Sequence, residues 1–149
     1  MVDISKKDEV YRAAVAEGEI KLHSNTIKLI REGGIAKGDP IQIAKIAGIQ
    51  GAKMVPQLIP LCHPIPIEQV DISIDLLNSS IKVRAKVIAH AKTGVEMEAL
   101  GGVTAALLNL WDVVKAYEKN VSGQYPETAI EFIRVISKVK ESDEKSRRA

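Results

Sequence analysis

Two short runs in which apolar and polar side chains alternate lie close together in this sequence, and they constrain its fold more than any other feature. The runs cover residues 70–76 and 81–87, and residues 77–80 separate them. Alternation with a period of two is typical of a β-strand with one buried and one solvated face. The two runs therefore predict an antiparallel hairpin.

Helices and two further strands are predicted around this hairpin. Ser24 is expected to be the N-cap of one helix, which Gly33 ends, and Asp39-Pro40 is typical of the start of another. The expected elements are a strand at 19–23, helices at 26–32 and from 39, the hairpin, a long helix at 94–119 and a strand at 134–140. This order predicts an α+β sandwich, with helices on one face of a mainly antiparallel sheet.

The chain has 149 residues, which is the length of one domain with a substantial core, so a single domain over residues 1–149 is expected. Residues 2–18 are polar and only loosely periodic, and residues 1–18 are therefore interpreted as an arm whose order depends on a partner. Residues 141–149 mix charges of both signs and are expected to be a solvated tail.

The second predicted helix carries a stripe of small residues at three- and four-residue spacing. The stripe consists of Ala44, Ala47, Gly48, Gly51 and Ala52. It predicts close approach by another helix or by a sheet. Together with the apolar positions of the long helix, the stripe suggests more apolar surface than one small domain buries, and we expect a hexamer.

Composition and charge argue against several classes of protein. The net charge is only +2 and the chain holds one Trp, three Tyr and one Phe, which disfavours a nucleic-acid binder. The longest apolar stretch, residues 103–111, is less than half of a membrane span, and the acidic N-terminus is unlike a secretory signal. Cys62 is the single cysteine. No membrane association is expected, and the cytoplasm is the expected location.

Common cofactor motifs are absent from the sequence. The glycine pairs lack the spacing of a phosphate-binding or dinucleotide-binding loop, and the three histidines lie far apart, so no metal site is expected. Prolines in residues 59–66 predict an extended connector that holds His63. Adjacent residues of an extended segment point to opposite faces, which disfavours a Cys62–His63 dyad. By itself Cys62 is typical of a small buried residue, whereas His63 fits either a backbone-bonded loop histidine or a functional one.

Five charged positions have a structural interpretation, and all of them except Glu96 also admit a functional one. Thr93 and Glu96 fit a helix capping box, and Glu98 fits a first-turn acid favoured by the helix dipole. Asp112 and Lys115 are neighbours on one helix face, which is typical of a surface ion pair but also of a catalytic pair. Lys37 precedes a helix N-terminus, and a lysine at such a position is either solvated or a ligand for phosphate.

Six blocks of the sequence resemble the molybdenum-cofactor biosynthesis protein C family, the cyclic pyranopterin monophosphate synthases. The resemblance extends from Met1 to about Lys140, and the blocks at 59–64 and 93–100 are the most specific. The blocks are 1–5 (MVDIS), 37–39 (KGD), 47–49 (AGI), 59–64 (IPLCHP), 93–100 (TGVEMEAL) and 111–116 (WDVVKA).

The resemblance implies a ferredoxin-like protomer that assembles as a trimer of dimers, with active sites at a subunit interface. It implies conversion of 3′,8-cyclo-7,8-dihydro-GTP, the product of a radical-SAM partner enzyme, to the cyclic phosphate with loss of pyrophosphate. The implied catalytic residues are Lys37, Asp112 and Lys115. The implied substrate-binding residues are Arg12, Lys53, Cys62, His63, Glu96, Met97, Glu98 and Lys138.

This chemistry needs cations beside the leaving pyrophosphate and groups that transfer protons. Burial or neighbouring cations are expected to lower the pKa of Lys115 toward neutrality, with Asp112 orienting it. No cofactor is expected beyond magnesium carried by the triphosphate. The alternative is a catalytically silent, oligomeric nucleotide-binding or scaffold protein of the same fold.

Overall fold

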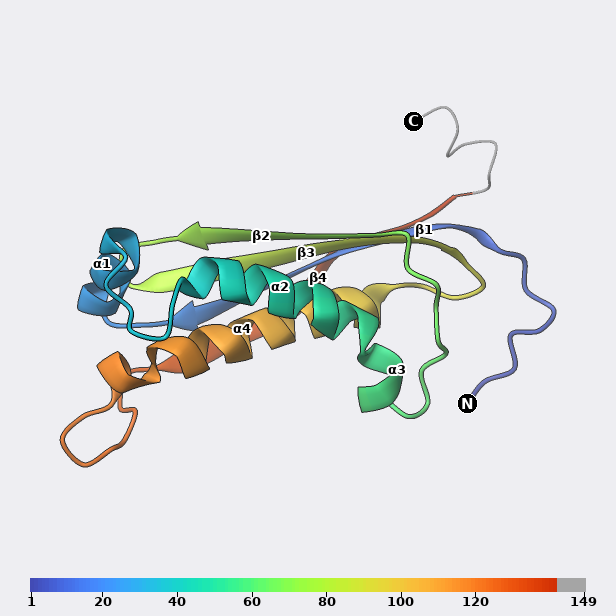
Figure 1. Cartoon of the computed structure of the whole chain (residues 1–149). Helices are drawn as coiled ribbons and strands as arrows, with labels where there is room; N and C mark the ends of the chain where they lie inside the picture. The colour runs from blue at the N-terminus through green and yellow to red at the C-terminus, as the bar shows by residue number, and fades with distance from the viewer. Residues whose placement is uncertain (142–149) are drawn as a thin grey trace.

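The computed structural model describes residues 1–141 and contains a four-stranded antiparallel sheet in the order β2-β3-β1-β4. The elements are β1 (Val10–Lys21), α1 (Ser24–Glu32), α2 (Pro40–Lys53), α3 (Val55–Leu58), β2 (Gln69–Leu76), β3 (Ser80–Ala91), α4 (Glu96–Glu118) and β4 (Ala129–Glu141). In Figure 1, α2 and α4 run along one face of the sheet, and α1 and α3 lie at opposite ends. The fold is a ferredoxin-like α+β sandwich, which confirms the predicted class.

The predicted hairpin is present as β2 and β3. The two strands are antiparallel, with Val70 opposite Val87 and Leu76 opposite Ile81. Side chains on one face of this hairpin are buried under α2 and α4, as Ile72 and Ala85 show with exposed fractions of 7% and 0%. Burial of a single face explains the alternation in the sequence.

The interpretation of residues 1–18 as an arm is wrong for residues 10–18. These residues belong to β1, which pairs with β3 on one side and with β4 on the other. The strand lacks the usual alternation of large apolar residues because it lies directly against α4. A Cβ atom on Gly18 would stand 2.7 Å from the Val103 side chain and 2.8 Å from that of Leu107. The predicted tail begins at Glu141, the last residue of β4, and residues 142–149 lie outside the described residues.

The small-residue stripe of α2 packs against α4 of the same chain. The Asp39 carboxylate caps α2 by accepting hydrogen bonds from the N–H groups of Ile41 (3.0 Å) and Gln42 (3.4 Å), as predicted. Gly48 and Gly51 then face the α4 backbone at Gly102 and Gly101. The stripe is therefore satisfied within one chain, and it is not evidence for a hexamer.

Replacing Gly51 with alanine is expected to lower the free energy of unfolding by about 1–3 kcal/mol, because overpacking a tight contact forces the backbone to shift. The added Cβ would stand 2.8 Å from the Gly101 carbonyl oxygen. Urea unfolding of Gly51→Ala checks this. Gln50→Ala, on the exposed face of the same helix, is the matched control and should change stability by about 0.5 kcal/mol or less. A similar stability for both variants would contradict the close approach.

The long helix α4 forms the centre of the core. Among residues 1–141 it is the one helix whose length and apolar composition would suffice to cross a membrane. Half of its most apolar stretch is buried in the domain, and Val103, Leu107 and Leu110 are fully buried. Packing within the domain therefore accounts for its apolar sequence.

The C-terminal end of α4 holds the start of α1 through a buried carboxylate. Ser24 does not cap α1 as predicted, because the helix begins at Ser24 and no side chain at its own N-cap provides a hydrogen bond. Instead Glu118, which is fully buried, accepts hydrogen bonds from the His23 N–H (3.1 Å), the Thr26 hydroxyl and the Thr128 hydroxyl (2.7 Å). Glu118 thus joins α4, α1 and the segment before β4.

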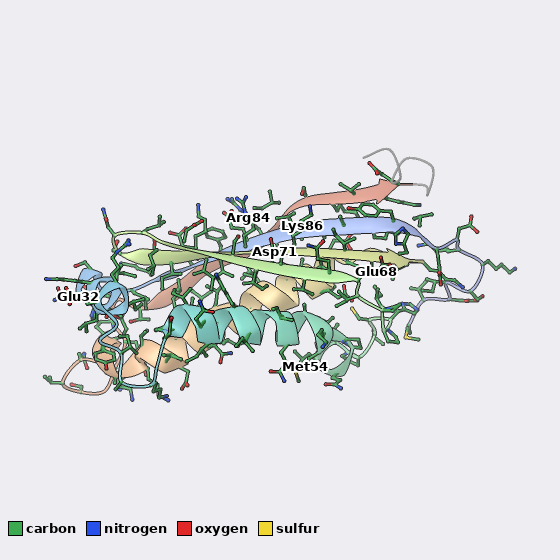
Figure 2. The ribbon with its side chains drawn as sticks, turned by 45° about the horizontal axis from the view of Figure 1, so that its top comes forward. Glu32, Met54, Glu68, Asp71, Arg84 and Lys86 are labelled. Carbon is green, nitrogen blue, oxygen red and sulfur yellow. The ribbon has the colours of Figure 1, made fainter. Side chains whose placement is uncertain are left out.

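The sheet face opposite α2 and α4 carries an ion-pair network around Glu17. Figure 2 shows Arg84 and Lys86 on this face, away from the helices. The Glu17 carboxylate is only 4% exposed and lies 2.8 Å from Arg84, 3.4 Å from Arg134 and 3.8 Å from Lys82. The hydrogen bond from Arg84 is the main cause of a lowered pKa for Glu17, although burial opposes it.

A carboxyl whose pKa is lowered on folding stabilises the native state above its ordinary pKa, about 4.3 for Glu, and this stabilisation disappears as the pH falls through the lowered value. We therefore expect Glu17→Gln to unfold at lower temperature than the wild type at pH 7, with a difference that closes below about pH 4. Thermal unfolding between pH 7 and pH 3 measures it. Glu32→Gln, which alters an exposed pair with Lys28, is the control. A difference independent of pH would contradict the role of this charge.

Candidate active site

Lys37, Asp112 and Lys115 meet on the exposed side of the C-terminal half of α4. The Lys115 Nζ lies 2.9 Å from Asp112 Oδ1, and the Lys37 Nζ lies 3.1 Å from Asp112 Oδ2 and 3.2 Å from the Asp112 carbonyl oxygen. The predicted helix neighbours are thus in contact. Only the tertiary structure adds Lys37, which comes from the loop between α1 and α2. We call these three residues the lysine–aspartate cluster.

The loop before α2 is held so that Lys37 reaches α4. The Ala36 N–H donates a hydrogen bond to the Tyr117 hydroxyl oxygen at 2.9 Å, and Ile35 is buried in the core. Gly38 has φ +127°, a conformation that favours glycine. Asp39 caps α2, and the Lys37 ammonium, which comes just before that helix, contacts the Asp112 carboxylate.

Charges within the cluster shift two pKa values. Hydrogen bonds from Lys115 and then from Lys37 lower the pKa of Asp112. The hydrogen bond and charge of Asp112 raise the pKa of Lys115. The expectation that burial or cations lower the pKa of Lys115 is therefore wrong for this chain, in which Lys115 is half-exposed and faces a carboxylate. The cluster holds two ammonium groups and one carboxylate, so it is positively charged.

A cavity of about 350 Å³ lies at the other end of α4, between its first turn, the connector before β2 and the N-terminal segment. We call it the acidic cavity, because two glutamates line it. It brings together five predicted site residues, Cys62, His63, Glu96, Met97 and Glu98. Its other lining residues are Val2, Ile4, Lys7, Leu61, Ile65, Thr93 and Gly94.

The connector before β2 reaches the acidic cavity through a turn. The Cys62 N–H donates to the Ile59 carbonyl oxygen at 3.1 Å, so residues 59–62 turn and only the following residues are extended. This corrects the prediction of extended structure from residue 59. Burial, with the nearby charge of Glu98, raises the pKa of the half-buried Cys62 thiol. The thiol therefore stays protonated at neutral pH and is a poor nucleophile.

Glu96 does not form the predicted capping box with Thr93. The N-cap of α4 is Val95, which has no side-chain hydrogen bond, and Glu96 instead pairs with Lys138 of β4. Burial would raise the pKa of Glu96, but the ion pair with Lys138 and the charge of Arg12 outweigh it and lower the pKa. Arg12 is buried and donates from Nε to the Ala91 carbonyl oxygen at 3.3 Å. Lys138 and Arg12 thus adjoin the cavity behind Glu96.

Glu98 is the most buried acid of the cavity, with an exposed fraction of 3%. Its Oε2 atom has no hydrogen-bond partner among the described residues. Burial is the main cause of a raised pKa for Glu98, and the charge of Glu96 raises it further. A hydrogen bond from its own backbone N–H opposes this rise in pKa, which is an interaction expected of an acid in the first turn of a helix.

Lys53 lies outside the acidic cavity. It lines a separate cavity of about 370 Å³ between the end of α2 and β2, together with Glu68 and Gln69. The two cavities share Ile65 as a common wall. Lys53 is therefore a predicted basic site residue that lies near neither Lys138 nor the lysine–aspartate cluster within one chain.

One chain does not bring the acidic cavity and the lysine–aspartate cluster together. Glu98 and Asp112 are fourteen residues apart in the same helix, which corresponds to about 21 Å at 1.5 Å per residue. In Figure 1, the N-terminal end of α4 lies toward α3 and its C-terminal end lies toward the loop that follows α1. The predicted residues other than Lys53 therefore form two half-sites.

Sequence reasoning missed Lys7, Val2 and Ile4, which line the acidic cavity from the N-terminal segment. A turn between Ile4 and Lys7 and a hydrogen bond from the Lys92 ammonium to the Ser5 carbonyl oxygen hold this segment. The only signal was the resemblance of residues 1–5 to the family, because the segment has no periodicity. Within residues 1–141, no group of three or more His, Cys, Asp or Glu side chains is placed to hold a metal ion.

The fold and the two half-sites define a class of protein, a ferredoxin-like α+β chain that offers an acidic cavity and a positively charged cluster to a small polar molecule. The MoaC family model matches residues 1–141. The chain therefore belongs to the MoaC family.

Relatives with high identity cover almost the whole chain, and each is named a probable cyclic pyranopterin monophosphate synthase. The protein from Saccharolobus solfataricus is 57% identical over 143 residues, 96% of each chain. The one from Pyrococcus horikoshii is 58% identical over 140 residues, 94% of this chain and 88% of the relative. The one from Sulfurisphaera tokodaii is 54% identical over 144 residues, 97% of this chain and 95% of the relative.

Proposed function

We propose that this protein is a lyase that converts 3′,8-cyclo-7,8-dihydro-GTP to cyclic pyranopterin monophosphate with release of pyrophosphate, a step of molybdenum cofactor biosynthesis. The observation that carries the proposal is an identity of 54–58% along nearly the whole chain with relatives named for that product. The contact of Lys37, Asp112 and Lys115 supports it, because those three residues match the catalytic positions of the family.

The chemistry of the proposed reaction divides between the two half-sites. Loss of pyrophosphate develops negative charge, which the ammonium groups of Lys37 and Lys115 would neutralise. The acidic cavity offers carboxyl groups and His63 to the nitrogen-rich ring, with Arg12 and Lys138 behind Glu96. Lys53 is proposed as a further cation. The protein would need no cofactor of its own, and magnesium would enter with the triphosphate.

We propose that the complete site forms between two copies of the chain. A catalytic group must lie within hydrogen-bond reach of the atom on which it acts, and the half-sites of one chain are about 21 Å apart. A two-fold related copy in the opposite orientation would place its cluster beside the cavity of the first. Exposed apolar residues flank both half-sites and would be covered, namely Leu58 (67%), Leu61 (69%) and Leu108 (56%).

The proposed assembly is a hexamer built as a trimer of dimers, located in the cytoplasm together with the radical-SAM enzyme that supplies the substrate. Analytical ultracentrifugation at micromolar concentration tests the assembly. A stable monomer under these conditions would contradict both the hexamer and the shared site.

The reaction is tested by incubating the purified protein with 3′,8-cyclo-7,8-dihydro-GTP. Release of pyrophosphate and, after oxidation, a fluorescent pterin are the expected results. GTP, which lacks the cyclised ring system, is the control substrate and should yield no pyrophosphate. Binding of the cyclised nucleotide without pyrophosphate release would favour the silent nucleotide-binding alternative. The contact of all three cluster residues favours the enzyme, since a silent relative has no need of that arrangement.

A further inference from the structure

The loop between α4 and β4, residues 119–128, is held in one shape by hydrogen bonds around Asn120. The Asn120 side-chain oxygen accepts hydrogen bonds from the N–H groups of Ser122 (2.9 Å) and Gln124 (3.0 Å). The Asn120 N–H donates to the Gln124 carbonyl oxygen at 2.9 Å, and Gly123 has φ +75°, a conformation that favours glycine. These contacts form a closed turn, which fixes the position of the residue that follows it.

The other end of this loop is tied back to α4 and to the start of α1. The Thr128 hydroxyl donates a hydrogen bond to the buried Glu118 carboxylate at 2.7 Å. The preceding residue, Glu127, has a carboxylate oxygen 3.0 Å from His23 Nε2. Because both ends of the loop are fixed, Tyr125 between them has little freedom to move.

Tyr125 lies over the face of α4 that carries Lys115. Its ring meets the Trp111 ring edge to face, with the centroids 5.3 Å apart, and the Lys119 Nζ lies 6.0 Å from its centroid. Residues four apart in a helix are neighbours on one face, so Lys115 lies between these two contacts. Asp112 is the main cause of the raised pKa of Lys115, and the nearby Tyr125 phenol raises it further. The contacts therefore place the Tyr125 ring beside the Lys115 side chain.

The ion pair between Lys115 and Asp112 needs a neighbour that limits its motion. The two side chains are 42% and 55% exposed, and an ion pair this exposed holds two flexible side chains only weakly. A lysine stem that packs along an aromatic ring loses rotamers while its ammonium group stays in water. The ring of Tyr125 can therefore restrict Lys115 without blocking its charged end.

We propose that Tyr125 is a positioning residue of the lysine–aspartate cluster, whose ring packs along the Lys115 side chain and keeps the ammonium group against the Asp112 carboxylate. The ring carries this effect, because the contacts with Trp111 and Lys119 are made by the ring. The loop of residues 119–128 acts through Tyr125 and touches no reacting atom. The inference rests on the proposed function only where it concerns turnover.

NMR relaxation of the Lys115 ammonium group at pH 7 tests the positioning without any ligand. Tyr125→Ala is expected to make this group as mobile as it is in Asp112→Asn, which lacks the charge of the pair. Tyr125→Phe keeps the ring and should leave the mobility unchanged. The matched control is Val121→Ala, a fully exposed position of the same loop, which should also leave it unchanged. An ammonium group in Tyr125→Ala that is as ordered as in the wild type would overturn the inference.

Steady-state kinetics with 3′,8-cyclo-7,8-dihydro-GTP separates positioning from substrate binding. A misplaced proton donor slows the reaction of bound substrate, so Tyr125→Ala should lower kcat by about tenfold or more and change KM by about threefold or less. Tyr125→Phe should keep kcat within about twofold of the wild type. A raised KM with unchanged kcat in Tyr125→Ala would show that Tyr125 binds substrate, and it would overturn the positioning role.

Equal losses of kcat in Tyr125→Phe and Tyr125→Ala would also overturn the inference, because they would assign the effect to the hydroxyl group. Circular dichroism verifies the fold of each variant. If Tyr125→Ala does not fold, Asn120→Ala replaces it, since this variant opens the turn that places Tyr125 and should also mobilise the Lys115 ammonium group. Absence of turnover in the wild type would count against the proposed function, whereas the NMR result decides the positioning by itself.

Discussion

Two damaged variants, Lys115→Ala and Glu98→Ala, are expected to recover activity when they assemble into one oligomer. Each variant damages a different half-site, and the half-sites of one chain lie about 21 Å apart along α4. In a dimer of the two variants, one shared site carries both defects, whereas the other combines an intact cluster with an intact cavity. Random pairing should then restore about a quarter of the wild-type activity, because half of the dimers are mixed and half of their sites are intact.

The measurement uses coexpression of the two variants with different affinity tags, followed by the pyrophosphate assay on the doubly purified oligomer. Each variant expressed alone is the control and should be less active than the mixture. A second control pairs Lys115→Ala with Lys37→Ala, which both damage the cluster, so that no shared site of the mixed oligomer is intact. No recovery in the first mixture would show that one chain provides the whole site.

Lys115→Ala is expected to lower turnover at saturating substrate by at least about 100-fold while fold and assembly persist, if Lys115 transfers a proton in the reaction. The side chain is half-exposed at the surface of α4, so its removal creates no cavity in the core. Lys115→Arg should not restore turnover, because guanidinium keeps its proton at every pH of interest. Single-turnover product formation measures both variants. Near-normal turnover in Lys115→Arg would show that Lys115 serves only as a counter-charge for phosphate.

Because Asp112 affects the pKa of Lys115, replacing Asp112 is expected to change how the activity depends on pH. The hydrogen bond and charge of Asp112 raise the pKa of Lys115, so the lysine is an ammonium ion and a proton donor in the free protein. In Asp112→Asn the pKa of Lys115 should fall, and activity that needs the ammonium form should decline at a lower pH than in the wild type. If the decline of activity at alkaline pH and the turnover were both the same as in the wild type, the role assigned to Asp112 would be contradicted.

The sequence correctly predicted those helices and strands that show a regular apolar pattern because one of their faces is buried. The hairpin of β2 and β3, the Asp39 cap of α2 and the long helix α4 were all correctly expected. The prediction failed for residues 10–18 of β1, since this inner strand carries Ala14, Ala16 and Gly18 where large apolar residues would mark a strand. These small residues are required by the closeness of α4, which no local pattern shows.

The candidate site was predicted in part, for a similar reason. Helical spacing alone placed Asp112 beside Lys115, and the resemblance to the family pointed to Lys37 and to the residues of the acidic cavity. Local reasoning misjudged Glu96, because its partner Lys138 lies far away in sequence on β4. It also misjudged the pKa of Lys115, whose direction depends on how exposed the side chain is and on which charges face it.

The sequence by itself determined the class of fold, the main helices and the hairpin, and through its family blocks the function that we propose. Periodicity and helix caps are local properties, so the chain shows them before it folds. Only the tertiary structure decided that Lys37 reaches Asp112, that Glu98 is buried in the wall of a cavity, and that cavity and cluster lie at opposite ends of α4. These features depend on packing between segments distant in sequence, which fixes both burial and the charges that each side chain meets.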